Sequence, residues 1–599
     1  MTSYSAPLRD IRFVLHDMLD IESHYASIPA FAEVSADVAD SVIEAAARFA
    51  ENDLAPLNRI GDEEGCQFND GVVTTPPGFK DAYAKFLELG FGALSAPVEY
   101  GGQGLPPSLG IVVGEMNGTA NWSWGMYPGL SNGAIETIKA HGTEAQKQAY
   151  LPPMTTGRWT GTMCLTEAHA GSDLGLIRTK AEPRPDGAYA ITGSKVFISA
   201  GEHDLAENIV HIVLARLPDA PKGTKGISLF VVPKYLAGAD GGVGERNAVH
   251  CVGIEHKMGI RASATCSMNF EGATGYLIGP PNRGLQSMFT FMNAARVGTA
   301  VQGVCTAEGA FQGALRYARD RLAMRSLSGP KAPEEEADPI IVHPAVRSML
   351  LTQKAFAEGG RVLVYWLATQ IDIAEAAGTP DVRKQADDLM SLLTPIAKAF
   401  LTEMGCEAAK HGVQIYGGHG FIREWGMEQV VRDARISTLY EGTTEIQALD
   451  LLGRKVLQSQ GELLKAFTKI IHKFCQANAE DPAMAEFVEP LAALNKAWGD
   501  ISISIGMKAI MNRDEIGAAA VDYLYYSGYV TLAYIWAWTA RTGLQKLQTA
   551  EGDAAFYQAK IQTAQFYYRR VLPRAQAHIE IIKGGREVIQ QMDEAAFAF

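Results

Sequence analysis

The sequence predicts an α+β multidomain protein, with helical domains on either side of a middle β domain. Apolar residues recur at helical spacing from residue 37 onwards. Short β-branched segments replace that spacing between residues 160 and 285, and helical spacing then returns and continues beyond residue 455. The 599 residues exceed what one hydrophobic core organises, so several domains are expected.

These changes of pattern divide the chain into five parts. An N-terminal arm is expected at 1–36, and an α domain at 37–159 begins with DVADSVIEAAARFAEN. A barrel-like β domain follows at 160–285, where TGTMCLTE, YAITGSKVFIS, IVHIVLARL, GISLFVVPK and ATCSMNFEG are expected strands between turn residues. A C-terminal four-helix-type bundle is expected at 286–455, and an appended helical domain at 456–599.

Composition and charge exclude several classes of protein. The net charge of −14 disfavours a nucleic-acid partner, because such partners require a basic surface. The seven cysteines are scattered without a CxxC pair, which indicates reduced thiols, no metal site and a cytoplasmic location. No basic stretch precedes an apolar core in the first residues, so no secretory signal is expected.

One long uncharged segment raises the question of a membrane span. Residues 523–540 read YLYYSGYVTLAYIWAWTA, a length at the lower edge of what crosses a bilayer. The segment contains several tyrosines and hydroxyl side chains, and Asp522 precedes it directly. We therefore expect a helix buried within a domain or subunit contact, and no membrane association.

Most standard enzyme motifs are missing, but four polar segments remain as candidates for a site. No GxGxxG opens a helix after a strand, and there is no P-loop, HExxH or GxSxG. The candidates are CLTEAHAGSD, KVFIS, QIYGGHGFIRE and LYEGTTEIQ. Each alone also suits a structural role, such as a hydroxyl turn, a core aromatic or a glycine-rich helix end. In the last segment, partial burial would raise the pKa of Glu441 towards the range of a general base.

The order of these segments within an α–β–α plan resembles the acyl-CoA dehydrogenase family. The matching residues are MCLTEAHAGSD, SKVFIS, the second arginine of YARDRLA (Arg321), QIYGGHGF and RDARISTLYEGTTEIQ, within residues 37–455. The resemblance implies FAD held without a Rossmann fold, between the β domain and the C-terminal helices. It implies that Glu441 removes the α-proton of an acyl-CoA while the β-hydride passes to flavin N5, giving the trans-2-enoyl-CoA.

The resemblance also implies which residues bind each ligand. The implied FAD contacts are Met163, Leu165, Thr166, Gly171, Ser172, Phe197, Ile198, Ser199, Arg321, Gln414, Gly417, Gly418, Thr443 and Glu445. The implied substrate contacts are Ser172, Arg296 and Gly442, and no metal is implied. The chain departs from the commonest family pattern at Ala168, Phe197, Ser199, Pro344 and Glu445, and after Arg321. The changes at Pro344 and Glu445 leave those two FAD contacts open.

The chain also resembles a larger bacterial subgroup, the 3-methylmercaptopropionyl-CoA dehydrogenases of dimethylsulfoniopropionate degradation, in its N-terminal arm, the segment CVGIEHKMGIRASATC and the residues beyond 455. This resemblance implies electron-transferring flavoprotein as acceptor. It favours a homodimer over a tetramer, because an appended domain would occupy the surface where a second dimer packs in the family. Four alternatives stay open: a medium- or long-chain acyl-CoA dehydrogenase, an acyl-CoA oxidase, a DNA-protecting flavoprotein of the alkylation response, and a helical scaffold without FAD.

Several charged residues near these segments are expected to be structural. Lys195, close to a strand turn, is expected to be a surface charge. Arg432 and Asp433 are expected to form a pair, and His411 and His419 to be hydrogen-bonded within the fold.

Overall fold

The computed structural model describes residues 4–238, 241–549 and 552–598. Its chain separates into two compact units. The helical unit contains Pro7–Asp40 and Thr299–Phe599, and the sheet unit contains Ser41–Gly298. The boundaries fall within helix α3 (Ala36–Phe49) and helix α9 (Gly284–Asp320). The five-part division drawn from the sequence stays a prediction.

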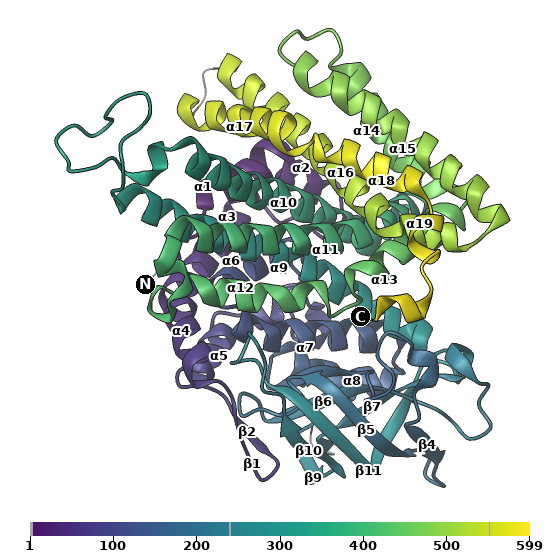
Figure 1. Cartoon of the computed structure of the whole chain (residues 1–599). Helices are drawn as coiled ribbons and strands as arrows, with labels where there is room; N and C mark the ends of the chain where they lie inside the picture. Colours follow the sequence, from purple (N-terminus) through teal and green to yellow (C-terminus); the bar gives the residue numbers. More distant parts are fainter. Residues whose placement is uncertain (1–3, 239–240, 550–551, 599) are drawn as a thin grey trace. The chain divides into compact units, whose positions relative to one another are not determined.

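The sheet unit is built on a seven-stranded mixed sheet (Figure 1). The strand order is β3-β6-β7-β11-β5-β4, with β10 paired to β11. Among the strand pairs in the described part of this sheet, β3 and β6 run parallel and the other pairs are antiparallel. Every residue of β6 and β7 is buried, as expected for strands covered on both faces. The strands are β1 (Gln67–Asn69), β2 (Val72–Thr74), β3 (Trp159–Cys164), β4 (Lys180–Pro183), β5 (Tyr189–Ser199), β6 (Asn208–Ala215), β7 (Ser228–Pro233), β8 (Tyr235–Ala237), β9 (Val243–Arg246), β10 (Val249–Ile254) and β11 (Thr265–Ile278).

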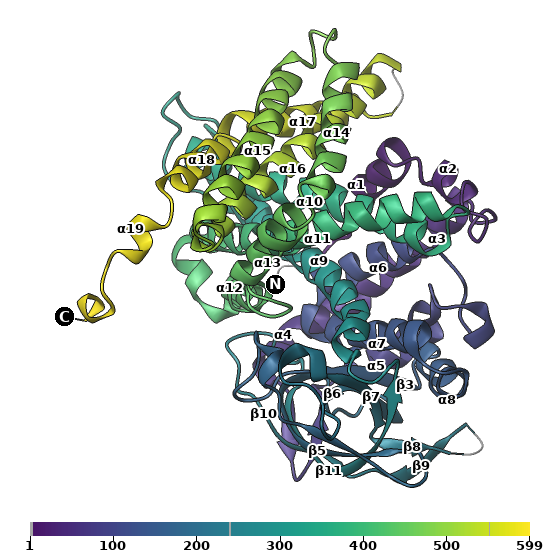
Figure 2. The same cartoon turned by 90° about the vertical axis from the view of Figure 1, so that its right-hand side faces the viewer.

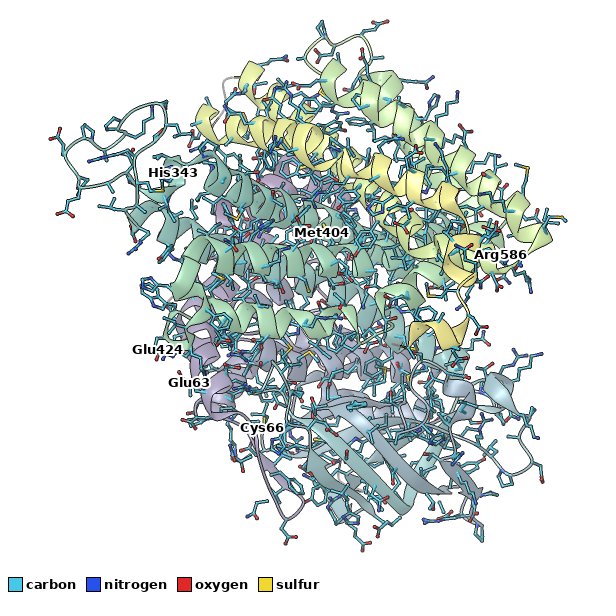
Figure 3. The ribbon with its side chains drawn as sticks, viewed as in Figure 1. Glu63, Cys66, His343, Met404, Glu424 and Arg586 are labelled. Carbon is cyan, nitrogen blue, oxygen red and sulfur yellow. The ribbon has the colours of Figure 1, made fainter. Side chains whose placement is uncertain are left out.

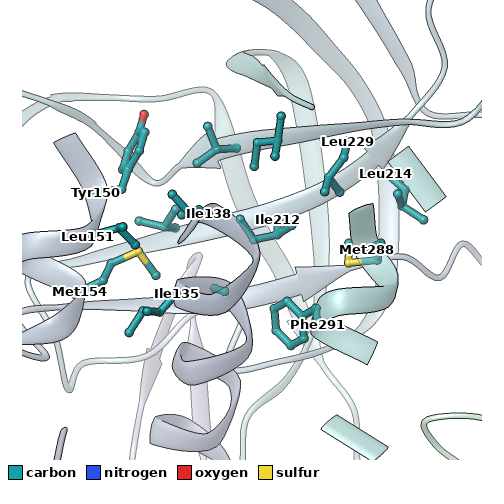
Figure 4. Close-up of a cluster of buried hydrophobic side chains, with 14 of the residues drawn as sticks. Ile135, Ile138, Tyr150, Leu151, Met154, Ile212, Leu214, Leu229, Met288 and Phe291 are labelled. Carbon is teal, nitrogen blue, oxygen red and sulfur yellow. The ribbon is translucent and has the colours of Figure 1, made fainter. Parts of the chain in front are cut away.

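Helices of the sheet unit bury one face of this sheet. Figure 4 shows Ile135 and Ile138 of α7 beside Ile212 of β6 and Phe291 of α9. All four side chains are at most 5% exposed, so the contact is a dry apolar core. The helices of this unit are α4 (Ala55–Glu64), α5 (Phe79–Glu88), α6 (Pro107–Ala120), α7 (Trp122–His141) and α8 (Glu144–Thr155). The predicted change from helices to a β domain is confirmed.

The helical unit is organised by three long helices, α10, α11 and α16. The first two pack along each other, and both contact α16 (Figures 1 and 2). Met404, labelled in Figure 3, is buried in the middle of α11. The helices are α1 (Leu8–Arg12), α2 (Ile21–Ala26), α10 (Pro344–Ala376), α11 (Pro380–Tyr416), α12 (Met427–Arg435), α13 (Thr444–Leu449), α14 (Glu462–Ala477), α15 (Ala485–Met511), α16 (Asp514–Thr549), α17 (Ala554–Phe566), α18 (Arg574–Gly584) and α19 (Glu587–Gln590).

The uncharged segment at 523–540 lies inside α16 and is buried against its neighbours. Its Trp536 ring N–H donates a 3.2 Å hydrogen bond to the Ala355 carbonyl of α10. In the part of the chain that the structure describes, no helix has the length and hydropathy needed to span a bilayer. The prediction of a buried helix is confirmed.

A buried ionic network fastens the N-terminal arm to the helical unit. The Asp10 carboxylate of α1 accepts hydrogen bonds from Arg361 of α10 and Lys560 of α17. Arg361 also pairs with Glu308 of α9 at 2.9 Å, and Lys560 pairs with Glu358 at 2.8 Å. Four separate segments of the chain therefore meet around one carboxylate.

Candidate active site

In the sheet unit, the loop after β3 is held by a buried ion pair. Lys195 of β5 donates to the Leu165 carbonyl at 3.0 Å and to Glu167 at 2.9 Å. Glu167 also accepts from the Thr179 hydroxyl at 2.6 Å and from the Arg178 backbone N–H at 2.7 Å. Burial alone would raise the pKa of Glu167, but the charge of Lys195 and these hydrogen bonds lower it to about 2.

The expectation that Lys195 is a surface charge was wrong. Its side chain is fully buried, and Glu167 supplies its counter-charge. A lysine on a strand with no carboxylate nearby in the sequence is expected at the surface. The carboxylate that pairs with Lys195 lies 28 positions away in the chain, so the local sequence does not indicate the pair. The effect is to hold Leu165 and the following loop against β5.

A bulge in β5 turns Phe197 outwards next to that loop. On β11, Met268 lies opposite Lys195 and Cys266 lies opposite Ile198, so the register between them is broken. Phe197 has a left-handed backbone, with φ of 60°, and its side chain is 63% exposed. The Val196 N–H donates to the Thr166 carbonyl at 2.9 Å, which brings Thr166 beside the bulge.

The other predicted residues of the sheet unit lie on β3, the loop after it, β5 and α9. Ser199 ends β5 opposite Thr265, while Met163 and Leu165 pack partly into the apolar core. Gly171 and Ser172 are exposed in the loop, and Ile198 is buried. Arg296 lies on α9 and is 7% exposed.

In the helical unit, the ends of α9 and α11 are fastened together by aromatic residues. Tyr317 stacks on Tyr416 with ring centroids 4.2 Å apart, and its hydroxyl is 2.9 Å from His419 Nδ1. His419 also stacks on Trp425, which confirms its structural role. Arg321 follows α9 directly, and its backbone N–H donates to the Tyr317 carbonyl. These contacts place the end of α9, which Arg321 follows, beside the glycine turn that ends α11.

That glycine turn presents open backbone to its surroundings. Gln414, Gly417 and Gly418 are all exposed. A Cβ added at Gly417 or Gly418 would meet no atom within 4 Å. Gly417 also has a φ of 59°, in the left-handed region that glycine tolerates best. The turn therefore allows a ligand to approach the backbone closely.

The segment with Glu441 forms a tight left-handed turn before α13. Glu441 has a φ of 58° and Gly442 a φ of 88°. A left-handed backbone costs a residue with a side chain about 1 to 2 kcal/mol. Gln447 donates to the Glu441 carbonyl at 2.8 Å, and Lys398 of α11 donates to the Gly442 carbonyl at 2.7 Å. These bonds hold the strained turn, with the Glu441 side chain half-buried.

The residues after the turn cap α13. The Thr443 hydroxyl accepts from the Ile446 N–H at 3.3 Å, as expected of a helix N-cap. Glu445 is exposed in the first turn of α13, and its own backbone N–H together with the Thr443 hydroxyl lowers its pKa. Sequence reasoning proposed Glu441 and its neighbours as site residues and did not include Lys398, which contacts this turn. The sequence feature that could have indicated Lys398 is its position as the single lysine within the apolar run LLTPIAKAFL.

The remaining charged residues near the site have partners within the helical unit. Arg432 pairs with Glu428, and Asp433 accepts from Gln429 at 3.1 Å. Each of these side chains therefore has a partner one helical turn away, and the expected pairing of Arg432 with Asp433 stays a prediction. His411 is 3.4 Å from Glu407, consistent with a structural role.

Four family models match consecutive stretches of the chain. They are the acyl-CoA dehydrogenase N-terminal domain at 37–158, the middle domain at 162–273 and the C-terminal domain at 282–457. The fourth, described as acetyl-CoA dehydrogenase C-terminal like, matches 467–593. Together they cover most of the chain, including the appended helices.

Relatives along the full length agree with these matches. The chain is 43% identical to the 3-methylmercaptopropionyl-CoA dehydrogenase of Ruegeria pomeroyi, over 98% of this chain and 99% of that protein. It is 33% identical to a broad-specificity linear acyl-CoA dehydrogenase of Mycobacterium tuberculosis, over the whole of both chains. An acyl-CoA dehydrogenase of Bacillus anthracis, solved with FAD, has the same fold with a TM-score of 0.74 and 21% identity, covering 93% of this chain and 90% of that one. The chain therefore belongs to the acyl-CoA dehydrogenase family of FAD-dependent oxidoreductases.

Proposed function

We propose that this acyl-CoA dehydrogenase oxidises 3-methylmercaptopropionyl-CoA to its trans-2-enoyl-CoA, with Glu441 as the catalytic base. The observation that carries the proposal is the left-handed turn at Glu441 and Gly442, held by Gln447 and Lys398. Strain of this kind concentrates at functional sites, where the surrounding structure imposes it. The full-length similarity to the Ruegeria pomeroyi enzyme supports the thioether substrate.

The residues present are suited to FAD. Phe197 offers an exposed aromatic face beside Thr166 and Ser199, which supplies both stacking and hydroxyl groups for a heteroaromatic ring. In the helical unit, exposed Arg321 and the open turn at Gly417 suit a diphosphate, which needs a cation and close backbone approach. The full set of proposed FAD residues is the one named from the sequence. When bound, FAD supplies the acceptor for the hydride that leaves the substrate's β-carbon.

The side chains of this protein supply the proton chemistry and the orientation of the substrate. Glu441 removes the α-proton, and the fixed turn limits the positions its carboxylate adopts, which favours catalysis through orientation. Gly442 has a φ of 88°, and a Cβ there would meet Gln447 Nε2 at 2.7 Å, so glycine preserves the turn whose backbone is the proposed thioester contact. Ser172 and Arg296 are the other proposed substrate contacts.

The test is anaerobic bleaching of the yellow protein by a panel of acyl-CoA thioesters. Butyryl, octanoyl, palmitoyl and 3-methylmercaptopropionyl thioesters are compared, with Glu441→Gln as the control. Fast bleaching by the sulfur substrate, lost in Glu441→Gln while its flavin content is unchanged, supports the proposal. Bleaching by the longer chains alone would replace the substrate with a medium- or long-chain acyl-CoA. The broad-specificity relative of Mycobacterium tuberculosis favours that second candidate.

Electron-transferring flavoprotein as the acceptor and a homodimer as the assembly belong to the same proposal. Rapid peroxide formation in air would instead identify an oxidase. A DNA gel shift without bleaching by any thioester would favour a DNA-protecting flavoprotein. Light scattering of the purified protein measures the assembly, and a tetrameric mass would contradict the dimer.

A further inference from the structure

We infer that Lys398 is a positioning residue that fixes the turn carrying Glu441. The inference rests on the proposed role of Glu441 as base. Lys398 lies within α11, and its side chain is completely buried. Its ammonium donates a 2.7 Å hydrogen bond to the carbonyl of Gly442, the residue directly after the base.

The first argument concerns the cost of burying a lysine. An ammonium removed from water loses hydration, and lysine is almost never fully buried unless it has a partner. The neighbouring helix positions Ile396, Ala397, Ala399 and Phe400 are also buried, and all four are apolar. A methionine of similar length would fill this space without that cost. The hydrogen bond from the ammonium to the Gly442 carbonyl therefore explains why position 398 carries a charge.

The second argument concerns the conformation of the turn. Glu441 and Gly442 are consecutive left-handed residues, and only the second is a glycine. Gln447 fixes the Glu441 carbonyl and Lys398 fixes the Gly442 carbonyl, so successive peptide groups are held by two different helices. Gln447 belongs to α13, which follows the turn and is itself joined to α11 by a 2.6 Å hydrogen bond from the Thr444 hydroxyl to Glu403. Lys398 connects the turn to α11, which packs along α10 in the body of the helical unit.

The third argument concerns the reach of the charge. The Lys398 ammonium is among the groups that lower the pKa of Glu445, four residues beyond the base. A cation held this close to the turn favours carboxylates over their protonated forms. Lys398 thus combines a hydrogen bond that fixes the backbone with a charge that acts along the same segment.

The experiment compares Lys398→Met and Lys398→Arg with a matched control, Lys455→Met. Lys455 also binds α11, through a 2.8 Å hydrogen bond to Ser391, and it lies 13 positions beyond Gly442 in the chain. Hydrogen–deuterium exchange of the peptide covering 439–447 measures how firmly the backbone of the turn is held, and it needs no substrate. We expect exchange in this peptide to rise at least tenfold in Lys398→Met and to stay within twofold of wild type in Lys455→Met.

Reductive half-reaction kinetics then show whether positioning matters for the proposed chemistry. We expect Lys398→Met to retain FAD and bind the enoyl-CoA product within about threefold, while bleaching slows about 100-fold, as displacement of a reacting group predicts. Lys398→Arg should recover part of that rate, because it restores a cationic donor. Unchanged exchange in the 439–447 peptide would overturn the inference. Faster exchange with an unchanged bleaching rate would also overturn it, since Lys398 would then be only structural. A wild-type protein that no thioester bleaches would refute the proposed function, while the exchange comparison would still decide whether Lys398 fixes the turn.

Discussion

Replacing Asp10 with asparagine should destabilise the helical unit by about 3 kcal/mol. Burial alone would raise the pKa of Asp10, but the charges of Lys560 and Arg361 lower it from 3.8 to about 2. That lowering corresponds to about 2 kcal/mol of stabilisation of the folded state. Asparagine also removes the negative charge that Arg361 and Lys560 share. Breaking a buried ion pair costs about 3 to 5 kcal/mol. Glu308 and Glu358 still pair with Arg361 and Lys560, which places the expected loss at the lower end.

The assay is urea unfolding, with circular dichroism and calorimetry as its two readouts. The control is Asp388→Asn, which removes an exposed partner of Lys384 and should change the unfolding free energy by less than about 0.5 kcal/mol. In the wild type, the Asp10 contribution should be complete above pH 3.8 and lost as the pH falls through about 2, because the folded-state pKa is depressed. If Asp10→Asn and Asp388→Asn unfold at the same urea concentration, the network does not fasten the arm.

Three further predictions concern the sheet unit and the turn at Glu441. Burial lowers the pKa of His203 and His211 to about 3, so their contribution to stability should be complete above pH 6.5 and lost as the pH falls towards 3. Acid titration followed by circular dichroism would contradict this if stability were constant between pH 6.5 and 4. Gly442→Ala would place a Cβ 2.7 Å from Gln447 Nε2 at a left-handed position, so bleaching should slow at least tenfold. Gly114→Ala, at an exposed helix site where a Cβ meets nothing within 4 Å, should instead raise the unfolding free energy by about 0.4 to 1 kcal/mol. Glu167→Gln leaves the Lys195 ammonium buried without its counter-charge, and the ratio of flavin to protein absorbance should fall. A purified Glu167→Gln protein with a full complement of FAD would show that the loop after β3 does not depend on this pair.

Much of the fold follows from local patterns. The switch from helical to alternating spacing near residue 160 is confirmed by β3, which begins at Trp159. The uncharged segment within α16 was predicted to be buried, and its burial among α11, α15 and α17 explains why it carries no charge. Such patterns are readable because a helix or strand must turn its apolar side chains to one face wherever it packs.

The sequence by itself determined the family, the helix–sheet–helix order and the segment that carries Glu441, because these depend on residues close together in the chain. Only the tertiary structure decided what holds that segment in place. Lys398 is 44 positions from Gly442, and Asp10 is 550 positions from Lys560. Lys195 was expected at the surface because its counter-charge, Glu167, becomes its neighbour only when β5 crosses the loop after β3. A buried charge is stable only beside its partner, and which residues become partners is set by packing between elements rather than by the pattern within any one of them.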